Sequence, residues 1–456
     1  MPGAALETWA VVAAVWAVAT RPLGRYVVRV VNREPTMLDP WLTRAEHWFV
    51  GRFGGDALES SPSFWRYGAS ALAVALGCGW AARLAGTAVG SAPPADAALA
   101  VAALLGGTAA QLAVVLVGLA ALGGRAPGRM AVDWLRLVLR VLVPLVLVMD
   151  VVLTAAGVGA AAALWDAARL VSGHSVAASS LVFSGSANVL AAACLGLLPL
   201  AVFYAAGPLT GRPALGRALP LVLVIWFGMV GAAVEWTSGS SLAGVPAAWG
   251  PAGAALHATA GAALGTGPGP VLTGVWPATL ATAGQLAQVI GGPAGVGLLP
   301  LMGLAILTAV VVNLMQGRSP VFLGRRVGRG AILAGAVLYG TRPVLVLGTL
   351  GVLAVAGPRQ GSLATRLTTV VATVASPHFG GTGALGVVSL VATYVPWVVW
   401  LRWAETGVRV EPRLRFGGGL VGERAWLAAL LAASVAMTAL LFLPVLALAP
   451  VVGAAP

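Results

Sequence analysis

The sequence of 456 residues contains no lysine, and only 9% of its residues are charged. All 27 basic residues are arginine, and the 14 acidic residues leave a net charge of +13. The phosphate-binding Walker A loop needs a lysine, as does an Asp-Lys-Thr-Gly phosphorylation sequence. The chain therefore carries neither ATPase signature, and any energy that it uses must come from a partner or from a gradient.

Cysteine and histidine are also scarce. Cys78 and Cys194 lie far apart in apolar stretches, and the four histidines are scattered along the chain. Neither residue type shows the spacing of a metal or redox motif. We expect both cysteines to be packing residues, and the sequence predicts no such metal site.

The shortage of charge goes with an excess of apolar residues, at 59% of the chain and a mean hydropathy of +0.93. Soluble domains contain about 25% charged residues, so a soluble enzyme and a nucleic-acid-binding domain are excluded. A membrane-spanning helix needs about 20 mostly apolar residues. The sequence predicts an all-α polytopic membrane protein with ten spans, at 5–22, 65–86, 109–123, 134–155, 189–207, 217–236, 297–316, 331–356, 384–402 and 425–448.

The arginines predict the orientation of these spans. With Arg66, five clusters hold 22 of the 27 arginines, and they follow the first, third, fifth, seventh and ninth spans. Positive residues collect on the cytoplasmic side, so the N-terminus is expected outside. Inner-leaflet anchoring explains the clusters better than nucleic-acid binding does. The clusters are 21–52, 125–140, 212–217, 318–329 and 402–424.

Between the clusters the same plan of span, outer segment and span returns four times. We expect one integral membrane domain, 1–456, in which the outer segments each join a short apolar stretch to small residues with glycine. The first span and its cytoplasmic loop fill 1–64, and a basic loop and the last span fill 403–456. The four repeats are 65–124, 125–211, 212–317 and 318–402.

The outer segments are candidate re-entrant pore loops. About ten apolar residues cannot cross a bilayer, and irregular backbone at membrane depth lines a cavity or is buried in protein. Carbonyls there can replace the hydration shell of a cation. The alternative for each loop alone is an ordinary glycine-rich connection. The candidate potassium-filter residues are Gly106, Gly107, Thr108, Ser184, Gly185, Ser186, Thr259, Gly261, Ser376, Gly380 and Gly381.

Several stretches resemble KdpA, the potassium-translocating A subunit of Kdp-type potassium-transporting P-type ATPases. The resemblance runs in order along the whole chain, and the Gly317–Arg326 and C-terminal stretches are its most specific parts. Gly317–Arg326 is similar to Gly-Arg-Thr-Pro-Glu-Tyr-Leu-Gly-Lys-Lys, which makes Arg318 a candidate functional residue. The other stretches are Arg21–Gly24, Glu34–Pro40, Val132–Arg136 with Val141–Pro144, and Phe442–Pro450.

The filter loops depart from this family's polar signatures. The first, Thr-Asn-Thr-Asn-Trp-Gln, falls on Gly106–Gln111, and the third, Ser-Cys-Gly-Ala, falls on Thr259–Ala262 with Ala260 at the cysteine. Gln288 stands where the family has a glutamate before Gly-Gly. Potassium coordination by carbonyls survives such changes, but selectivity depends on how the carbonyls are held.

The resemblance implies a potassium-binding subunit of the bacterial plasma membrane. It implies a catalytic P-type ATPase B subunit, a C subunit and a small single-span subunit as partners, with no nucleotide bound by this chain. Two alternatives stay open: a non-conducting paralogue that acts as a scaffold or regulator, and a stand-alone monovalent cation channel or transporter.

Charges inside the predicted spans are few. Arg342 lies in the middle of 331–356, where a central arginine costs roughly 2.5–3.5 kcal/mol. It is a candidate electrostatic element beside the ion path, or a snorkelling residue at a helix break before Pro343. Asp133, Arg136 and Arg140 share about one helical face and predict a solvated or inter-subunit entry to the fourth span.

Overall fold

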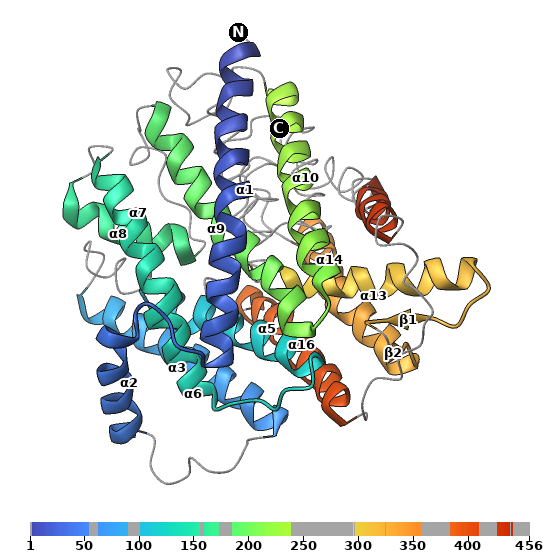
Figure 1. The fold of residues 1–456 in the computed structure, drawn as a ribbon, viewed down its shortest axis with the longest axis horizontal. Coiled ribbons are helices and arrows are strands. Elements are labelled where there is room, and N and C mark those ends of the chain that lie inside the picture. The colour runs from blue at the N-terminus through green and yellow to red at the C-terminus, as the bar shows by residue number, and fades with distance from the viewer. Residues whose placement is uncertain are drawn as a thin grey trace.

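The computed structural model is built almost wholly of helices (Figure 1). One two-stranded hairpin, β1 (Val321–Phe322) with β2 (Arg325–Arg326), is the exception among the described residues. The all-α class expected from the sequence is confirmed. The structure describes residues 2–53, 63–89, 101–155, 159–172, 185–238, 295, 297–323, 325–356, 384–409, 426–437 and 439–440.

Nine of the ten predicted spans fall on helices of the described chain, and the last, 425–448, is described as helix over 426–437 and 439–440. Six segments are long and apolar enough to cross a membrane, and three shorter apolar helices accompany them. A polytopic membrane protein is thereby confirmed, while the count of ten and the four repeats stay predictions. The six segments are Ala10–Asn32, Ala103–Leu122, Met130–Ala155, Leu298–Met315, Arg329–Val352 and Val387–Thr406; the shorter helices are Gly196–Thr210, Pro213–Ile225 and Trp426–Met437.

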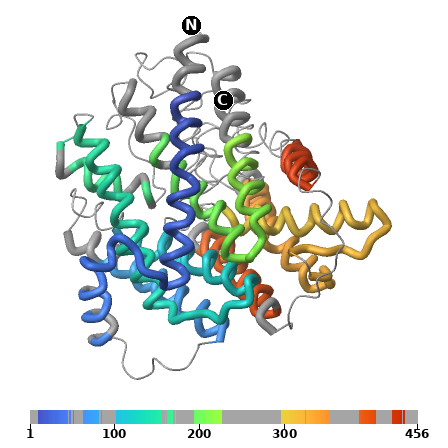
Figure 2. The backbone as a smooth tube through the Cα atoms, in the orientation of Figure 1, coloured from blue at the N-terminus to red at the C-terminus, as the bar shows by residue number. Residues whose placement is uncertain are grey.

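The first helix, α1 (Pro2–Asn32), packs along α9 (Gly185–Thr210), as both ribbon views show (Figures 1 and 2). The approach is close because α9 carries Gly196 where a Cβ would strike the indole of Trp16. The same indole donates a hydrogen bond of 2.8 Å to the Ala193 carbonyl. A glycine on one helix thus makes room for a large side chain of the other, and small residues at helix contacts are common in membrane bundles.

A central helix, α5 (Ala109–Leu122), is buried at every residue. It contacts α3 (Phe64–Val89), α9 and α16 (Ala384–Arg409). The indole of Trp400 on α16 covers Gly118 and donates to the Val114 carbonyl at 3.2 Å. An apolar helix without a polar face is stable only when neighbours enclose it, and here the neighbours come from three parts of the sequence.

Helix α13 (Leu298–Met315), at the end of the predicted third repeat, crosses α14 (Arg329–Ala356) of the predicted fourth repeat at Gly303 and Gly335. A Cβ on Gly303 would lie 2.7 Å from the Gly335 carbonyl oxygen. α14 runs unbroken through Pro343, so the helix break considered for that position is absent. The fixed φ of proline is compatible with a helix, and packing against α13 and α16 offsets the missing hydrogen bond.

Glycine and proline set the ends of several helices. Gly211, with φ of +68°, ends α9, and Pro213 begins α10 (Pro213–Ser238) two residues later. Gly317, with φ of +67°, ends α13 before the arginine-rich hairpin. A left-handed glycine after a helix and a proline in its first turn are frequent stop and start signals. The remaining helices are α2 (Asp39–Phe53), α6 (Met130–Leu137), α7 (Val143–Ala155) and α8 (Ala160–Ser172).

Candidate functional site

The first predicted filter segment is a helical turn. Gly106, Gly107 and Thr108 lie in a π-helical segment, η2 (Ala103–Thr108), which continues directly into α5. The expectation of an irregular backbone at this segment is therefore wrong. Alanines on both sides favour helix, and the paired glycines leave room for the wider turn, a feature often found at functional sites.

The η2 turn is packed tightly from two sides. A Cβ on Gly106 would lie 2.5 Å from the Cβ of Cys78 on α3 and 3.2 Å from the Ala75 carbonyl oxygen. The Leu105 carbonyl accepts a hydrogen bond of 2.7 Å from the indole N–H of Trp134. The Leu104 carbonyl accepts the Ala109 N–H. The turn is thus held in place, with these two carbonyls already engaged by protein donors.

One turn further along, Gln111 brings an amide into the apolar interior. Thr108 is fully buried and Gln111 is 1% exposed. The Oε1 atom of Gln111 has no hydrogen-bond partner among the described residues. Leaving such an acceptor unpaired costs about 1–3 kcal/mol. This oxygen is available to a cation or a water. Gln111 was not among the predicted site residues, although it aligns with the last residue of the family's first filter signature.

The other predicted filter residues are placed only in part. Gly185 and Ser186 form the first turn of α9. The role of Gly185 and Ser186 in ion binding stays a prediction. Ser184, Thr259, Gly261, Ser376, Gly380 and Gly381 lie outside the described residues.

The two candidate arginines lie on different elements. Arg342 is partly buried within α14. The sequence has no acidic residue between Glu235 and Glu405 that could neutralise it locally. Arg318 is exposed just beyond α13, where its N–H donates to the Asn313 carbonyl at 3.0 Å. Arg318 therefore helps to end α13, and the electrostatic role of Arg342 remains a hypothesis.

The nearby hairpin gathers basic side chains around carbonyl groups. Arg325 donates to the Leu122 carbonyl at the end of α5 at 3.3 Å, and Arg212 donates to the Leu323 carbonyl at 3.1 Å. Burial, together with the charge of Arg212, lowers the pKa of Arg325. Cations near the C-terminal end of a helix are stabilised by its dipole, so these arginines fasten the hairpin to the helix bundle.

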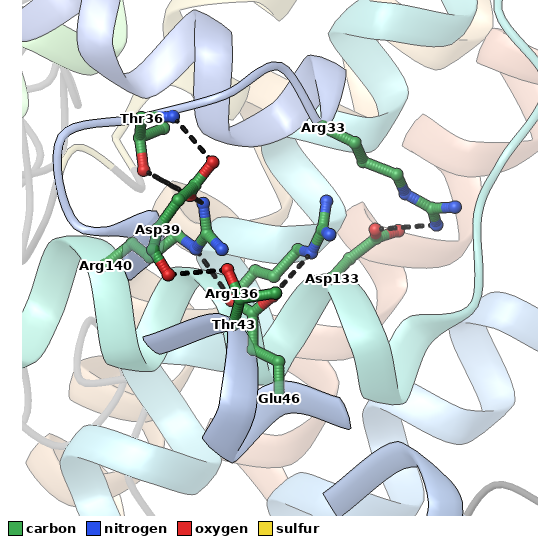
Figure 3. A network of polar contacts seen from close by, with 8 residues as sticks. All are labelled: Arg33, Thr36, Asp39, Thr43, Glu46, Asp133, Arg136 and Arg140. Carbon is green, nitrogen blue, oxygen red and sulfur yellow. Dashed lines mark hydrogen bonds and ion pairs between the residues drawn. The ribbon is translucent and has the colours of Figure 1, made fainter. Parts of the chain in front are cut away.

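A second polar centre surrounds Arg140, which is 4% exposed (Figure 3). Its guanidinium bonds the Glu46 carboxylate at 2.7 Å, the Thr36 hydroxyl at 2.9 Å and the Asp39 carboxylate. Arg136 forms an ion pair of 3.3 Å with the other oxygen of Glu46. We call these five residues the Arg140 network. It joins α2 to the π-helical segment η3 (Val138–Leu142) between α6 and α7.

Further bonds tie the same region to α1. Tyr26 donates to the Arg140 carbonyl at 2.9 Å, and Arg33 pairs with Asp133 at 3.1 Å. The prediction of a solvated entry to the fourth span is therefore wrong for Arg140, because helix α2 covers its side chain. The network also connects two stretches, 34–40 and 132–144, that carry the family resemblance.

Asp39 opens α2 and receives several donors. The Thr36 N–H and hydroxyl bond its two carboxylate oxygens at 3.0 and 2.8 Å. Burial acts to raise the pKa of Asp39, but these hydrogen bonds and the charge of Arg140 outweigh it and bring the pKa below 3.8. The carboxylate is therefore held in its charged form, as an ion-pair network requires.

Metal-type ligands do not cluster in the part of the chain that the structure describes. No group of three histidine, cysteine or acidic side chains could hold a metal ion there. Cys194 is buried and Cys78 partly so, and both are free. The unpaired Gln111 oxygen is a neutral oxygen of the kind that suits a monovalent cation.

Comparison with known proteins gives a consistent result. Residues 183–378 match the model of the family described as Potassium-transporting ATPase A subunit. This segment runs from the second predicted filter loop into the fourth.

Three curated relatives carry the name Potassium-transporting ATPase potassium-binding subunit. The protein of Kineococcus radiotolerans is 29% identical over 197 residues, which are 39% of this chain and 35% of the relative. That of Streptomyces griseus is 30% identical over 168 residues, 33% of this chain and 30% of the relative. A Mycobacterium sp. protein is 38% identical over 82 residues, which are 18% of this chain and 15% of the relative.

The chain matches about a third or less of the length of each of these relatives. The family match, the relatives and the all-helical membrane fold agree with one another. Residues 183–378 of this chain are similar to the KdpA family, the A subunits of potassium-transporting ATPases.

Proposed function

We propose that this protein binds potassium ions and passes them across the bacterial plasma membrane as one subunit of an ATP-driven uptake complex. The single observation that carries the proposal is the family match, which starts beside Ser184 and ends at His378. It covers the second and third predicted filter loops and reaches into the fourth. The N-terminus lies outside in this proposal, because the arginine clusters then face the cytoplasm.

The proposed partner is a P-type ATPase catalytic subunit. A chain without lysine carries no Walker A loop, so ATP hydrolysis must take place on another subunit. The family further suggests a C subunit and a small single-span subunit. This chain binds no nucleotide in the proposal and contributes only the ion path.

The buried amide of Gln111 supports an ion path beside η2. The segment Ala103–Leu122 is the most enclosed of the candidate spans, because 89% of its 18-residue apolar stretch is buried inside the protein. An unpaired oxygen there is costly unless something occupies it. Potassium gives up its hydration shell readily to neutral oxygens. We infer that Gln111 completes the first filter segment of this chain.

The test is potassium-stimulated ATPase activity of the purified complex. Gln111→Leu keeps the volume of the side chain and removes its oxygen. We expect the potassium concentration for half-maximal stimulation to rise about tenfold, since a hydrogen-bond-type interaction with a charge is worth about 1.5–3 kcal/mol. Gln316→Leu is the matched control, because Gln316 is exposed at the end of α13. An unchanged potassium dependence in Gln111→Leu would remove Gln111 from the path.

A non-conducting scaffold or regulator is the second candidate. Its support is the engagement of the Leu104 and Leu105 carbonyls by Ala109 and Trp134, which takes two filter-segment acceptors away from an ion. Growth of a deletion strain at limiting potassium separates the two functions. If the chain assembles with an ATPase partner but restores neither growth nor potassium-stimulated hydrolysis, the scaffold is correct. Potassium flux through the chain alone would favour a stand-alone channel or transporter.

A further inference from the structure

Helix α2 has its polarity reversed relative to a helix that faces water. Its described exposed face contains Trp41 and Trp48, which are 82% and 68% exposed, whereas Glu46 is buried. A solvated helix shows charge outward and aromatic groups inward. Some apolar or interfacial environment must therefore cover this face. We call it the Trp41 face; its members are Pro40, Trp41, Arg44, His47, Trp48 and Gly51.

The Arg140 network fixes the direction in which this face points. Asp39 and Glu46 lie seven residues apart, two turns along α2, and both bond the guanidinium of Arg140. Thr43 lies between them and donates to the Asp39 carbonyl at 2.6 Å. Because the inward side is bonded at both turns, α2 cannot rotate to bury its tryptophans without breaking the buried ion pairs (Figure 3).

The same bonds set the depth of α2 relative to the membrane. Arg140 belongs to the candidate span Met130–Ala155, and its carbonyl accepts from Tyr26 of the candidate span Ala10–Asn32. α2 begins at Asp39, only seven residues after the span Ala10–Asn32 ends. Tyr26 lies six residues before the end of its span, and Arg140 lies ten residues inside the 26-residue span Met130–Ala155, within its first half. A helix bonded to the predicted cytoplasmic halves of two spans lies beside the membrane rather than deep in the cytoplasm.

The chemistry of the face matches anionic lipid. Tryptophan concentrates at the level of the headgroups. Arg44 is exposed on the same face, where the described side chains include no acid. α1 adds exposed arginines at a spacing of four residues, Arg21, Arg25 and Arg29. Each basic residue near an anionic leaflet contributes about 1 kcal/mol. A partner protein would need an acidic surface at the same depth, whereas the inner leaflet supplies negative charge there without one.

We propose that the Trp41 face of α2 binds the headgroup layer of the inner leaflet, with Trp41 and Trp48 inserted between headgroups and Arg44 paired with anionic phospholipid. The Arg140 network positions the helix for this contact. The inference is independent of potassium transport, because lipid binding needs neither an ion nor an ATPase partner. It makes α2 a lipid-facing anchor that is fastened to the membrane spans from inside.

The first experiment measures thermal unfolding of the full chain in nanodiscs of phosphatidylcholine, with and without 30% phosphatidylglycerol, as about the anionic fraction of a bacterial leaflet. We expect phosphatidylglycerol to raise the melting temperature of the wild type. The triple variant Trp41→Ala/Arg44→Gln/Trp48→Ala should lose most of that shift, and Arg44→Gln alone should weaken phosphatidylglycerol binding roughly fivefold. Trp80→Ala/Arg329→Gln is the control, because both residues are exposed on other elements. An equal loss in the control would overturn the proposal.

The second experiment measures depth directly and does not depend on stability. A bimane label on His47→Cys, in a Cys78→Ala/Cys194→Ala background, reports on the middle of the Trp41 face. We expect quenching by headgroup spin-labelled lipid and protection from iodide in the water phase. Strong iodide quenching in lipid without the partner subunits would overturn the proposal. Recovery of protection only after adding a partner subunit would assign the face to a protein.

Discussion

The two π-helical turns of this protein, η2 and η3, are alike in backbone and opposite in how they satisfy polar groups. In η3, Arg140 is buried, and the carboxylates of Glu46 and Asp39 together with the Thr36 hydroxyl surround it. Beside η2, the Gln111 oxygen is equally buried but has no partner among the described residues. The protein itself supplies the partners of Arg140 in η3, whereas among the described residues nothing donates to the Gln111 oxygen beside η2.

This difference separates a structural device from a candidate binding device. A saturated network of buried charges holds elements in one arrangement and offers nothing to a ligand. An unsaturated oxygen in an apolar interior raises the energy of the empty protein, and a ligand that pairs with it recovers that energy. The comparison thus assigns the attachment of α2 to η3, and it leaves Gln111 beside η2 as the proposed ion contact.

The largest expected effect comes from breaking the Arg140 network. Arg140→Ala leaves Asp39 without a cationic partner and Glu46 with Arg136 alone, and removing one member of a buried pair costs about 3–5 kcal/mol. We expect a large fall in the melting temperature of the purified protein. Arg402→Gln is the control, because the Arg402–Glu405 pair is exposed on the arginine side and worth at most about 1 kcal/mol.

A companion variant sharpens the first result. Arg140→Leu combined with Glu46→Leu and Asp39→Asn removes three of the four charges of the network and leaves only that of Arg136, whose side chain is 23% exposed. The triple variant should therefore be more stable than Arg140→Ala alone. If the triple variant is the less stable of the two, the cost does not come from uncompensated charge, and the network is not a saturated ion-pair lock.

A smaller effect is expected from filling the packed side of η2. Gly106→Ala places a methyl group 2.5 Å from the Cβ of Cys78, and overpacking of this kind costs about 1–3 kcal/mol. Thermal unfolding should show the loss, and adding Cys78→Gly should restore part of it. Gly77→Ala on the same stretch of α3 is the control, since nothing lies within 4 Å of its Cβ. Equal stability of the two alanine variants would contradict the close packing of η2.

The smallest effect on stability is expected from lowering the pH. The pKa of Asp39 is lower in the folded protein than the ordinary 3.8. The unfolded chain therefore binds the proton first, and the stability from this carboxylate is complete above pH 4 and is lost as the pH falls through the folded pKa. A melting-temperature profile between pH 5 and 2 should flatten in Asp39→Asn. A wild-type profile that matches the variant would show that Arg140 does not favour the charged form.

The sequence predicted the fold class well and the candidate site in part. Composition and arginine placement were sufficient for a polytopic helical protein, because the bilayer requires long apolar helices whatever their arrangement. The segment 106–108 was correctly located next to a buried helix but predicted as irregular backbone. Glycine permits several conformations, and Trp134 and Cys78, which hold the turn, lie 26 or more residues away in the sequence.

Arg140 shows what helical spacing alone cannot predict. Helical spacing placed Asp133, Arg136 and Arg140 on one face but could not say what meets that face. The structure supplies α2 there, with Glu46 lying 94 residues earlier in the chain. Gln111 was visible in the aligned filter signature, yet its unpaired state depends on helices that contribute no donor.

The sequence by itself determined that the chain is a helical membrane protein, that it carries no Walker A lysine and that it resembles KdpA. Those properties follow from composition and local motifs, since hydropathy, missing lysine and short signatures do not depend on packing. Only the tertiary structure decided that 34–40 and 132–144 form one buried ion-pair network, and that α2 turns its tryptophans outward. The reason is that the partner of a buried charge is chosen by the contacts between distant helices.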